Sequence, residues 1–246
     1  MAGPDSSNAG RLVAKLERAL ALSGPERQAL LDLPMQVLPL RADQDLVREG
    51  DRPSRCFLLL DGFACTLKPT AEGKRQILSL HVPGDMPDLQ SFHLGTLDHT
   101  IGTLTPCLAG FIYHDDLRDL WSRHRRLQDA FWRMTLVDAA IAREWMVGLK
   151  RRHAYARVAH LFCELVVRLG VAGLAEDRTC RLPITQSEFA DLLGLSTVHV
   201  NRTVQELRTA GLIALERGVF RALDWEGLKA AGGFDPAYLH LEPSTR

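Results

Sequence analysis

The segment from Ser196 to Leu207 carries side chains that could read the bases of double-stranded DNA. Serine is a residue type that begins helices, and the apolar residues Val200, Val204 and Leu207 follow Ser196 at helical spacing. The opposite face of this expected helix presents short polar groups and one guanidinium, from Thr197, His199, Asn201, Arg202 and Gln205. Such groups form hydrogen bonds with base edges, and an arginine can contact both major-groove acceptors of a guanine. The segment is therefore a candidate recognition helix, although any amphipathic surface helix also has a polar face.

A second short helix is expected directly before this one. Thr185 and Glu188 have the spacing of a capping box, so a helix begins at Gln186, and Gly194 ends it. Two short helices joined by a tight glycine turn form a helix-turn-helix. Thr185 and Gln186, at the start of the first helix, join Ser196 and the polar face of the second helix as candidate DNA-binding residues.

A hairpin is expected after the recognition helix. Residues 215–221 have the pattern of a strand, a turn at Gly218 and a second strand. A hairpin in this place is the wing of a winged helix, where Arg217 and Arg221 can contact phosphates. The polar face of the preceding helix therefore gains a structural context that favours DNA binding.

The N-terminal part of the chain changes from helical to strand patterning. Residues 12–33 have apolar positions at helical spacing, whereas residues 38–114 consist of short apolar runs separated by glycines. Short strands at this spacing predict an antiparallel barrel or roll, and so a first domain over residues 1–114. The fold class is α+β: a β-roll, a long helix and a C-terminal winged helix-turn-helix.

One long helix is expected over residues 115–152, before a DNA-binding domain over residues 153–246. The seam positions of this helix are Leu127, Phe131, Met134, Asp138, Ile141 and Trp145. An exposed apolar seam of this length predicts pairing with a second copy of the chain across a two-fold axis. Packing of the seam on the chain's own roll is the open alternative.

The composition limits the classes of partner. The 246 residues are 46% apolar and 24% charged with a formal net charge of zero, so any contact with nucleic acid must use a local patch. No apolar run reaches the roughly 18 residues of a membrane helix, and the first ten residues lack a signal-peptide pattern. We therefore expect a cytoplasmic protein that does not contact the membrane.

The five cysteines predict no metal site, because neighbouring cysteines are separated by 9, 42, 56 and 17 positions. Cys180 lies between Arg178 and Arg181, which could lower the pKa of its thiol and make it a redox switch. A plain structural role is the favoured interpretation of Cys180, and the redox switch is the alternative.

Four segments resemble the Crp/Fnr family of bacterial transcription regulators: LVREGD at 46–51, LLLDGFA at 58–64, GKRQILSLHVPGD at 73–85 and ITQSEFADLLGLSTVHVNRTVQELRTAGLI at 184–213. The resemblance implies a roll of the cyclic-nucleotide-binding type, a dimerisation helix and a winged helix on a palindromic promoter site. It also implies a homodimer that works with RNA polymerase and is not an enzyme. Arg202 matches the family arginine that reads guanine, whereas Val198 stands where family members commonly have a glutamate. Val198 could instead contact a thymine methyl group.

The ligand pocket of the family is degenerate in this chain. The corresponding positions are Asp88, Leu89, His99, Thr100, Ala142 and Arg143. His99 and Thr100 stand at the Arg-Ser pair with which cyclic-nucleotide binders hold the phosphate, and a neutral histidine cannot replace that guanidinium. Ala142 and Arg143 stand where the cyclic AMP receptor has two hydroxyl residues. We therefore expect no binding of cyclic AMP.

The sequence also bears on other cofactors. The iron-sulfur members of the family use cysteines near the N-terminus, and none precedes Cys56 here. An axial haem ligand remains conceivable among His81, His93, His99 and His114. A cupin-like metalloenzyme using His81, His93 and His99 is disfavoured, because they are 12 and 6 residues apart and lack a close His-x-His pair. A roll that senses nothing is the remaining alternative, and no cofactor is predicted.

Overall fold

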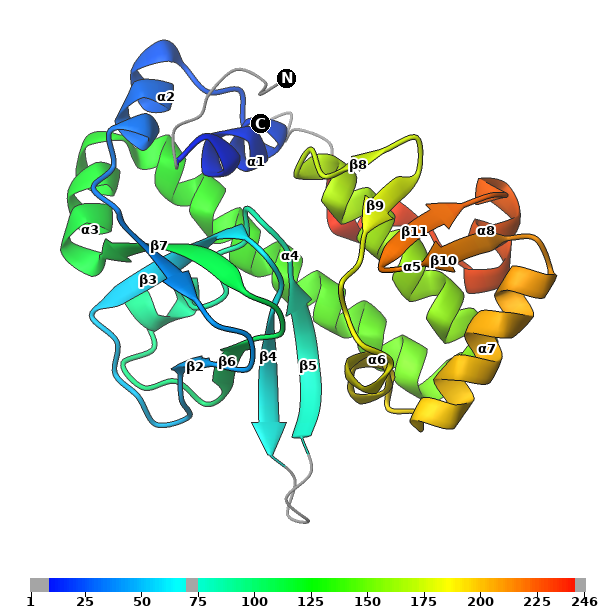
Figure 1. Ribbon diagram of the computed structural model, residues 1–246. Helices are drawn as coiled ribbons and strands as arrows, with labels where there is room; N and C mark the ends of the chain where they lie inside the picture. Colours follow the sequence, from blue (N-terminus) through cyan, green and yellow to red (C-terminus); the bar gives the residue numbers. More distant parts are fainter. Residues whose placement is uncertain (1–8, 70–74, 242–246) are drawn as a thin grey trace. The chain divides into compact units, whose positions relative to one another are not determined.

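The computed structural model describes residues 9–69 and 75–241 (Figure 1). The described residues divide into two compact units. The first unit holds the chain up to Lys68, Leu80–Ala139 and the stretch from His240, and the second holds Pro69–Ser79 and Ala140–Leu239. The boundary between the units therefore falls within the long helix.

Two antiparallel sheets form the roll (Figure 1). Their strands are β1 (Gln36–Leu40), β2 (Asp45–Val47), β3 (Arg55–Asp61), β4 (Ala64–Pro69), β5 (Arg75–His81), β6 (Thr100–Thr103) and β7 (Cys107–Tyr113). The strand orders are β1-β7-β3 and β2-β6-β4-β5. The predicted antiparallel roll is confirmed.

All side chains from Cys56 to Leu60 of β3 are buried. Because alternate side chains of a strand point to opposite sides, both faces of β3 are covered. Leu58 packs into the core under the helices, whereas Phe57 packs inside the roll against Phe111. Gly62 turns the chain from β3 into β4 with φ of +86°, and a Cβ there would lie 2.4 Å from the carbonyl oxygen of Pro106. The turn therefore requires glycine.

Helices cover one side of the roll. They are α1 (Gly10–Ala19), α2 (Gly24–Leu31), the 3-10 helix η1 (Leu89–Phe92), α3 (His114–Arg123) and the first part of α4 (Arg125–Arg151). The single helix expected from residue 115 is interrupted at His124, whose φ of −133° and ψ of 75° are not helical. Leu120 of α3 and Leu127 of α4 nevertheless pack into the same apolar core.

The seam predicted on the long helix is not exposed. Leu127, Phe131 and Met134 are buried in the core of the first unit, so the expectation of an exposed seam is wrong for them. Asp138 is half-buried, Ile141 is buried, and Trp145 donates a hydrogen bond to Glu164 of the same chain. The large apolar residues that α4 exposes are Trp132 (42%), Leu136 (65%), Met146 (56%), Val147 (49%) and Leu149 (44%). The heptad pattern identified the face of α4 that the chain's own core uses.

The second unit contains the end of α4 and a winged helix. Its further elements are α5 (Ala154–Val171), β8 (Ala175–Glu176), β9 (Thr179–Arg181), α6 (Gln186–Leu193), α7 (Thr197–Thr209), β10 (Ile213–Glu216), β11 (Val219–Ala222), α8 (Trp225–Gly232) and the 3-10 helix η2 (Pro236–Leu239). The sheet has the order β10-β11-β9-β8. Phe162 of α5 joins sheet and helices, because its ring lies 4.7 Å from that of Phe220 and 5.7 Å from that of Phe189.

None of the helices within the described residues is long and apolar enough to cross a membrane.

Candidate nucleic-acid interface

Local hydrogen bonds place the two helices of the helix-turn-helix. Thr185 and Glu188 form the predicted capping box: the Glu188 amide donates to Thr185 Oγ1 over 3.2 Å, and the Thr185 amide donates to the Glu188 carboxylate over 2.6 Å. Gly194 ends α6 in the left-handed region with φ of +60°. The hydroxyl of Ser196 then accepts the amide of His199 over 3.2 Å and begins α7. The expected helix boundaries are confirmed, because each depends on a contact within four residues.

The inward face of α7 is the predicted one. Val200, Val204 and Leu207 are buried, and so is Thr203 between them. On α6, Phe189 contributes to the same buried interior. Burial on one side of α7 leaves its other side facing solvent.

The outward face of α7 presents most of the predicted DNA-binding residues. Thr197, Arg202 and Gln205 are exposed, and His199 and Asn201 are half-buried. Before α7, the structure exposes Ser196 and, at the start of α6, Thr185 and Gln186. These side chains thus belong to one supersecondary unit that can meet a groove and its flanking phosphates.

Sequence reasoning missed an acidic neighbour of the main base-reading candidate. Glu206 lies four residues after Arg202, and its Oε1 lies 3.6 Å from Arg202 Nε. The spacing of i and i+4 on a helix could have revealed this pair. Both side chains are more than half exposed, so the pair contributes little stability and leaves the guanidinium available to a ligand.

Val198 is the most exposed large apolar side chain described, at 78%. It lies in the first turn of α7, beside Thr197. An exposed β-branched side chain at this place can contact the methyl group of a thymine, in addition to the hydrogen bonds that the neighbouring polar side chains can form with bases.

The wing is a tight two-residue hairpin between β10 and β11. Its turn residues, Arg217 and Gly218, have φ of +51° and +75°. Such a turn favours asparagine or glycine, and an arginine in the left-handed region is strained. The Arg217 side chain is exposed and has no hydrogen-bond or ion-pair partner within residues 9–69 and 75–241. No hydrogen bond or ion pair of this side chain among the described residues offsets the strain.

The turn between β8 and β9 provides a contrast. Arg178 also has a positive φ, of +58°, but its guanidinium lies 4.3 Å from the ring centre of Trp225. A cation-π contact of this kind stabilises the folded state by about 0.5–1 kcal/mol. The two arginine turns therefore differ in whether the side chain has a structural role.

The degenerate pocket residues of the roll have partners of their own. Asp88 is buried, its Oδ1 accepts the amide of Phe57 over 3.0 Å, and burial raises its pKa to about 7. His99 contacts the Asp98 carboxylate over 2.7 Å and the Gln90 amide over 3.1 Å. The remaining positions are Leu89, which is buried, Thr100, whose hydroxyl accepts the amide of Glu49, and Ala142 and Arg143, which are exposed on α4 in the second unit.

The other histidines of the roll also have neighbours within the first unit. His81 contacts the hydroxyl of Thr66 over 2.8 Å, and His114 contacts that of Ser91 over 3.1 Å. The ring of His93 stacks on that of Trp132 of α4, with 4.7 Å between the ring centres. Among the described residues no group of three or more His, Cys, Asp or Glu side chains could hold a metal ion.

Cys180 does not have the environment that a redox switch requires. Its side chain is buried in β9, and burial raises the pKa of the thiol to about 12. The two flanking arginines do not lower it, because Arg178 stacks on Trp225 and Arg181 points to solvent on the other face of the strand. The hypothesis of a lowered thiol pKa is wrong.

Comparison with known proteins identifies both parts of the chain. Residues 37–124 match the cyclic nucleotide-binding domain, and residues 156–231 match the Crp-like helix-turn-helix domain. The nitrogen fixation regulation protein FixK of Bradyrhizobium diazoefficiens is 30% identical over 179 residues, which are 72% of this chain and 73% of that protein. The transcriptional activator protein FnrA of Stutzerimonas stutzeri is 27% identical over 217 residues, 87% of each.

A solved structure has the same fold. FixK2 from Bradyrhizobium japonicum covers 82% of this chain and 100% of its own, with a TM-score of 0.73 and 21% identity. The roll, the long helix and the exposed helix-turn-helix together define a DNA-binding transcription regulator. The chain belongs to the Crp/Fnr family, which is a family of regulators and not of enzymes.

Proposed function

We propose that the protein is a homodimeric, sequence-specific regulator that inserts α7 of each subunit into successive major grooves of a palindromic site. Grooves on one face of B-DNA are about 34 Å apart. The observation that carries the proposal is the outward face of α7, on which Thr197, Arg202 and Gln205 are exposed beside Val198.

Base readout rests on two exposed side chains. Arg202 would donate to O6 and N7 of a guanine, and its pairing with Glu206 at 3.6 Å is weak enough to be exchanged for the base. Val198 would contact the methyl group of a thymine. His199 and Asn201, which are half-buried, would contribute from the side of the helix that meets the groove wall.

Phosphate contacts would set the register of the helix on the duplex. Thr185, Gln186 and Ser196 lie at the exposed starts of α6 and α7, where backbone amides and the helix dipole attract anions. Arg217 would reach a phosphate beside the major groove from the tip of the wing. The strained backbone of Arg217, with its positive φ, supports this role, because strained residues concentrate at functional positions.

The second copy of the chain would pack on the exposed stripe of α4. Trp132, Leu136, Met146 and Val147 recur at spacings that keep them on one side of a helix, with Ala139 and Arg143 between them. A two-fold axis would bring this stripe against itself and bury the large apolar groups. This stripe replaces the buried seam as the proposed dimer interface.

Regulation would not use cyclic AMP or an iron-sulfur cluster. The proposal rests on the missing phosphate-binding guanidinium at His99 and on the absence of cysteines before Cys56 in the sequence. The alternative is a roll that binds an unidentified small molecule or haem. Titration of the purified protein with candidate effectors would decide, since a true effector must change the affinity for DNA. We expect the regulator to work with RNA polymerase in the cytoplasm.

The first experiment is the selection of binding sites from random duplex DNA with purified, ligand-free protein. We expect enrichment of a palindrome with a guanine in each half-site. Enrichment of an unpaired half-site would contradict the dimeric mode, and no enrichment would contradict binding without an effector.

A further inference from the structure

The end of α4 and the turn of the helix-turn-helix meet at one arginine of the second unit. Only Arg152 and His153 separate the end of α4 from the start of α5. Arg157 follows in the first turn of α5, where it faces the last turn of α4 and the end of α6. The arrangement lies wholly within residues 140–239.

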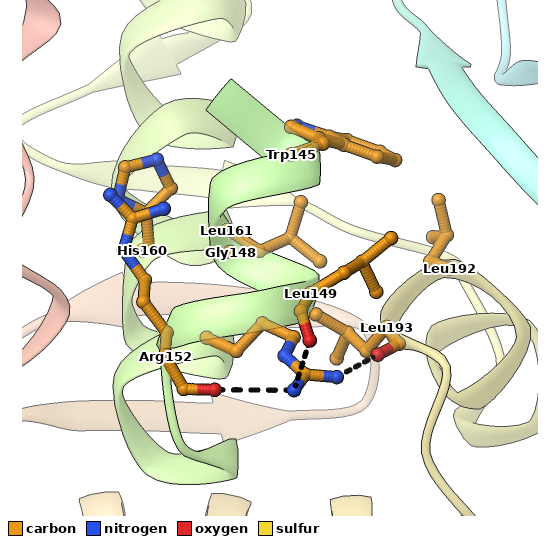
Figure 2. Close-up of a pocket in the computed structure, with 9 residues that line it drawn as sticks. Trp145, Gly148, Leu149, Arg152, His160, Leu161, Leu192 and Leu193 are labelled. Atoms are coloured by element: carbon orange, nitrogen blue, oxygen red, sulfur yellow. Dashed lines mark hydrogen bonds between the residues drawn. The ribbon is translucent and has the colours of Figure 1, made fainter. Parts of the chain in front are cut away.

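The Arg157 guanidinium donates to carbonyl groups of both helix ends. Nη1 donates to the carbonyl of Leu193, the last residue of α6, over 2.5 Å. Nη2 donates to the carbonyls of Arg152 over 3.2 Å and of Leu149, in the last turn of α4, over 3.4 Å. The dashed lines in Figure 2 mark these bonds. Carbonyls at a helix C-terminus lack partners within the helix and carry partial negative charge. The guanidinium of Arg157 therefore satisfies carbonyls at the C-termini of both α4 and α6.

Apolar packing around this arginine is incomplete. A cavity of about 30 Å³ lies beside it, with room for about one water molecule (Figure 2). Its lining includes the apolar residues Trp145, Leu149, Leu161 and Leu192 as well as Arg152 and His160. Burial lowers the pKa of the guanidinium, and its Nε has no hydrogen-bond partner in the part of the chain that the structure describes. The three hydrogen bonds of the guanidinium to Leu193, Arg152 and Leu149 therefore join the helix ends beside this gap in the packing.

A second set of contacts joins the same end of α4 to α5 and η2 within the second unit. The indole of Trp145 donates to Glu164 Oε2 over 3.0 Å, and the hydroxyl of Tyr238 donates to the same oxygen over 2.8 Å. Arg168 donates to Glu164 Oε1 over 2.9 Å. The positive charge of this guanidinium therefore balances the negative charge of the fully buried Glu164 carboxylate. The helices α4 and α5 are thereby joined, and Arg157 extends the connection to α6.

We propose that Arg157 is a positioning residue that sets the angle between the end of α4 and the helix-turn-helix. This proposal rests on the proposed function, in which α4 pairs two subunits on a palindrome. The pairing of α4 across the dimer axis would then fix the position of the turn at Gly194 through Arg157. The position of this turn would in turn set the separation of the two recognition helices. Arg157 would determine which half-site spacing the dimer accepts, without contacting DNA.

The test compares affinity for the selected palindrome with affinity for the same site lengthened or shortened by one base pair. R157Q removes the charge and the two-pronged donor, and R157K keeps the charge with a single donor group. K229Q is the control, because Lys229 forms a surface ion pair with Glu226 on α8 and its replacement also removes one positive charge. A single half-site reports whether the helix-turn-helix itself is intact.

We expect the wild-type protein and K229Q to lose about tenfold or more in affinity when the spacing changes by one base pair. R157Q should bind the preferred palindrome about tenfold more weakly, since it cannot form the charged hydrogen bonds of the arginine. Its penalty for altered spacing should fall below about threefold, and its affinity for the single half-site should stay within about twofold of wild type. The affinity of R157K for the preferred palindrome and its penalty for altered spacing should lie between those of the wild-type protein and R157Q.

A wild-type spacing preference in R157Q overturns the proposal. If circular dichroism shows that R157Q does not fold, the same comparison with R157K decides, and an unchanged preference there overturns it. A wild-type protein that selects no palindrome contradicts the proposed function itself, which distinguishes that failure from a failure of the role of Arg157.

Discussion

Replacement of Arg217 by asparagine should make the C-terminal unit more stable and its binding to DNA weaker. Arg217 occupies the left-handed region with φ of +51° in a turn that favours asparagine, and no partner within the described residues offsets the cost. A left-handed conformation costs an ordinary residue about 1–2 kcal/mol, of which asparagine recovers part. We expect R217N to raise the free energy of unfolding by about 0.5–1 kcal/mol, or the melting temperature by about 2–4 °C.

The same substitution removes one proposed phosphate interaction of each subunit. Binding then releases fewer counterions, so the slope of log K against log salt should become shallower by about 0.9 for each phosphate that the protein no longer neutralises. The affinity for specific and random duplexes should fall by a similar factor, because an interaction with phosphate carries no sequence information. Thermal unfolding followed by circular dichroism and anisotropy titrations over a range of salt concentrations measure both effects.

R178N provides the matched control, because Arg178 has a similar φ but stacks on Trp225. Relief of strain and removal of the cation-π interaction should nearly cancel, and the salt dependence should stay unchanged. An R217N protein with unchanged stability would refute the strain argument. Unchanged salt dependence in R217N would refute the proposed interaction with phosphate.

Three further substitutions test the other parts of the structure. R202A should lose about 1–3 kcal/mol of binding free energy on the selected site and much less on random DNA, measured by competition titrations. W132D should separate the dimer into folded monomers in sedimentation. The two-fold axis would place the negatively charged aspartates of the two subunits on facing stripes of α4, where like charges repel. D88N should flatten the dependence of stability on pH. The pKa of Asp88 in the folded state, about 7, exceeds the unfolded value of about 3.9, so wild-type stability falls as pH rises between these values.

Each of these predictions has a contradicting result. Equal losses of R202A on both duplexes would exclude base readout by this arginine. An intact W132D dimer would mean that another surface pairs the subunits. A D88N protein whose stability keeps the wild-type pH dependence between about pH 4 and 7 would show that Asp88 does not hold the buried proton.

Local chemistry made the helix-turn-helix predictable. The caps at Thr185 and Ser196 and the turn at Gly194 depend on residues within four positions of each other, and the structure confirms them. The roll was predictable for a similar reason, since alternation and glycine spacing act within one or two strands. The family segments add specificity to both predictions.

The use of each face of α4 could not be predicted in this way. Phe131 and Trp132 are adjacent in sequence, and only the roll decides that Phe131 is buried in the core while Trp132 is exposed. The environment of Cys180 depends in the same way on tertiary packing, because burial in β9 outweighs the charges next to it in sequence.

The sequence by itself determined the two helices of the helix-turn-helix, where the DNA-binding helix begins and which of its faces points outward. These properties follow from contacts between near neighbours and from a period of 3.6 or 2 residues. Tertiary structure alone decided that Arg157 joins Leu149 and Leu193 and that Glu164 accepts from Trp145 and Tyr238. Those contacts join residues 8 to 74 positions apart, where periodicity carries no information about which groups meet.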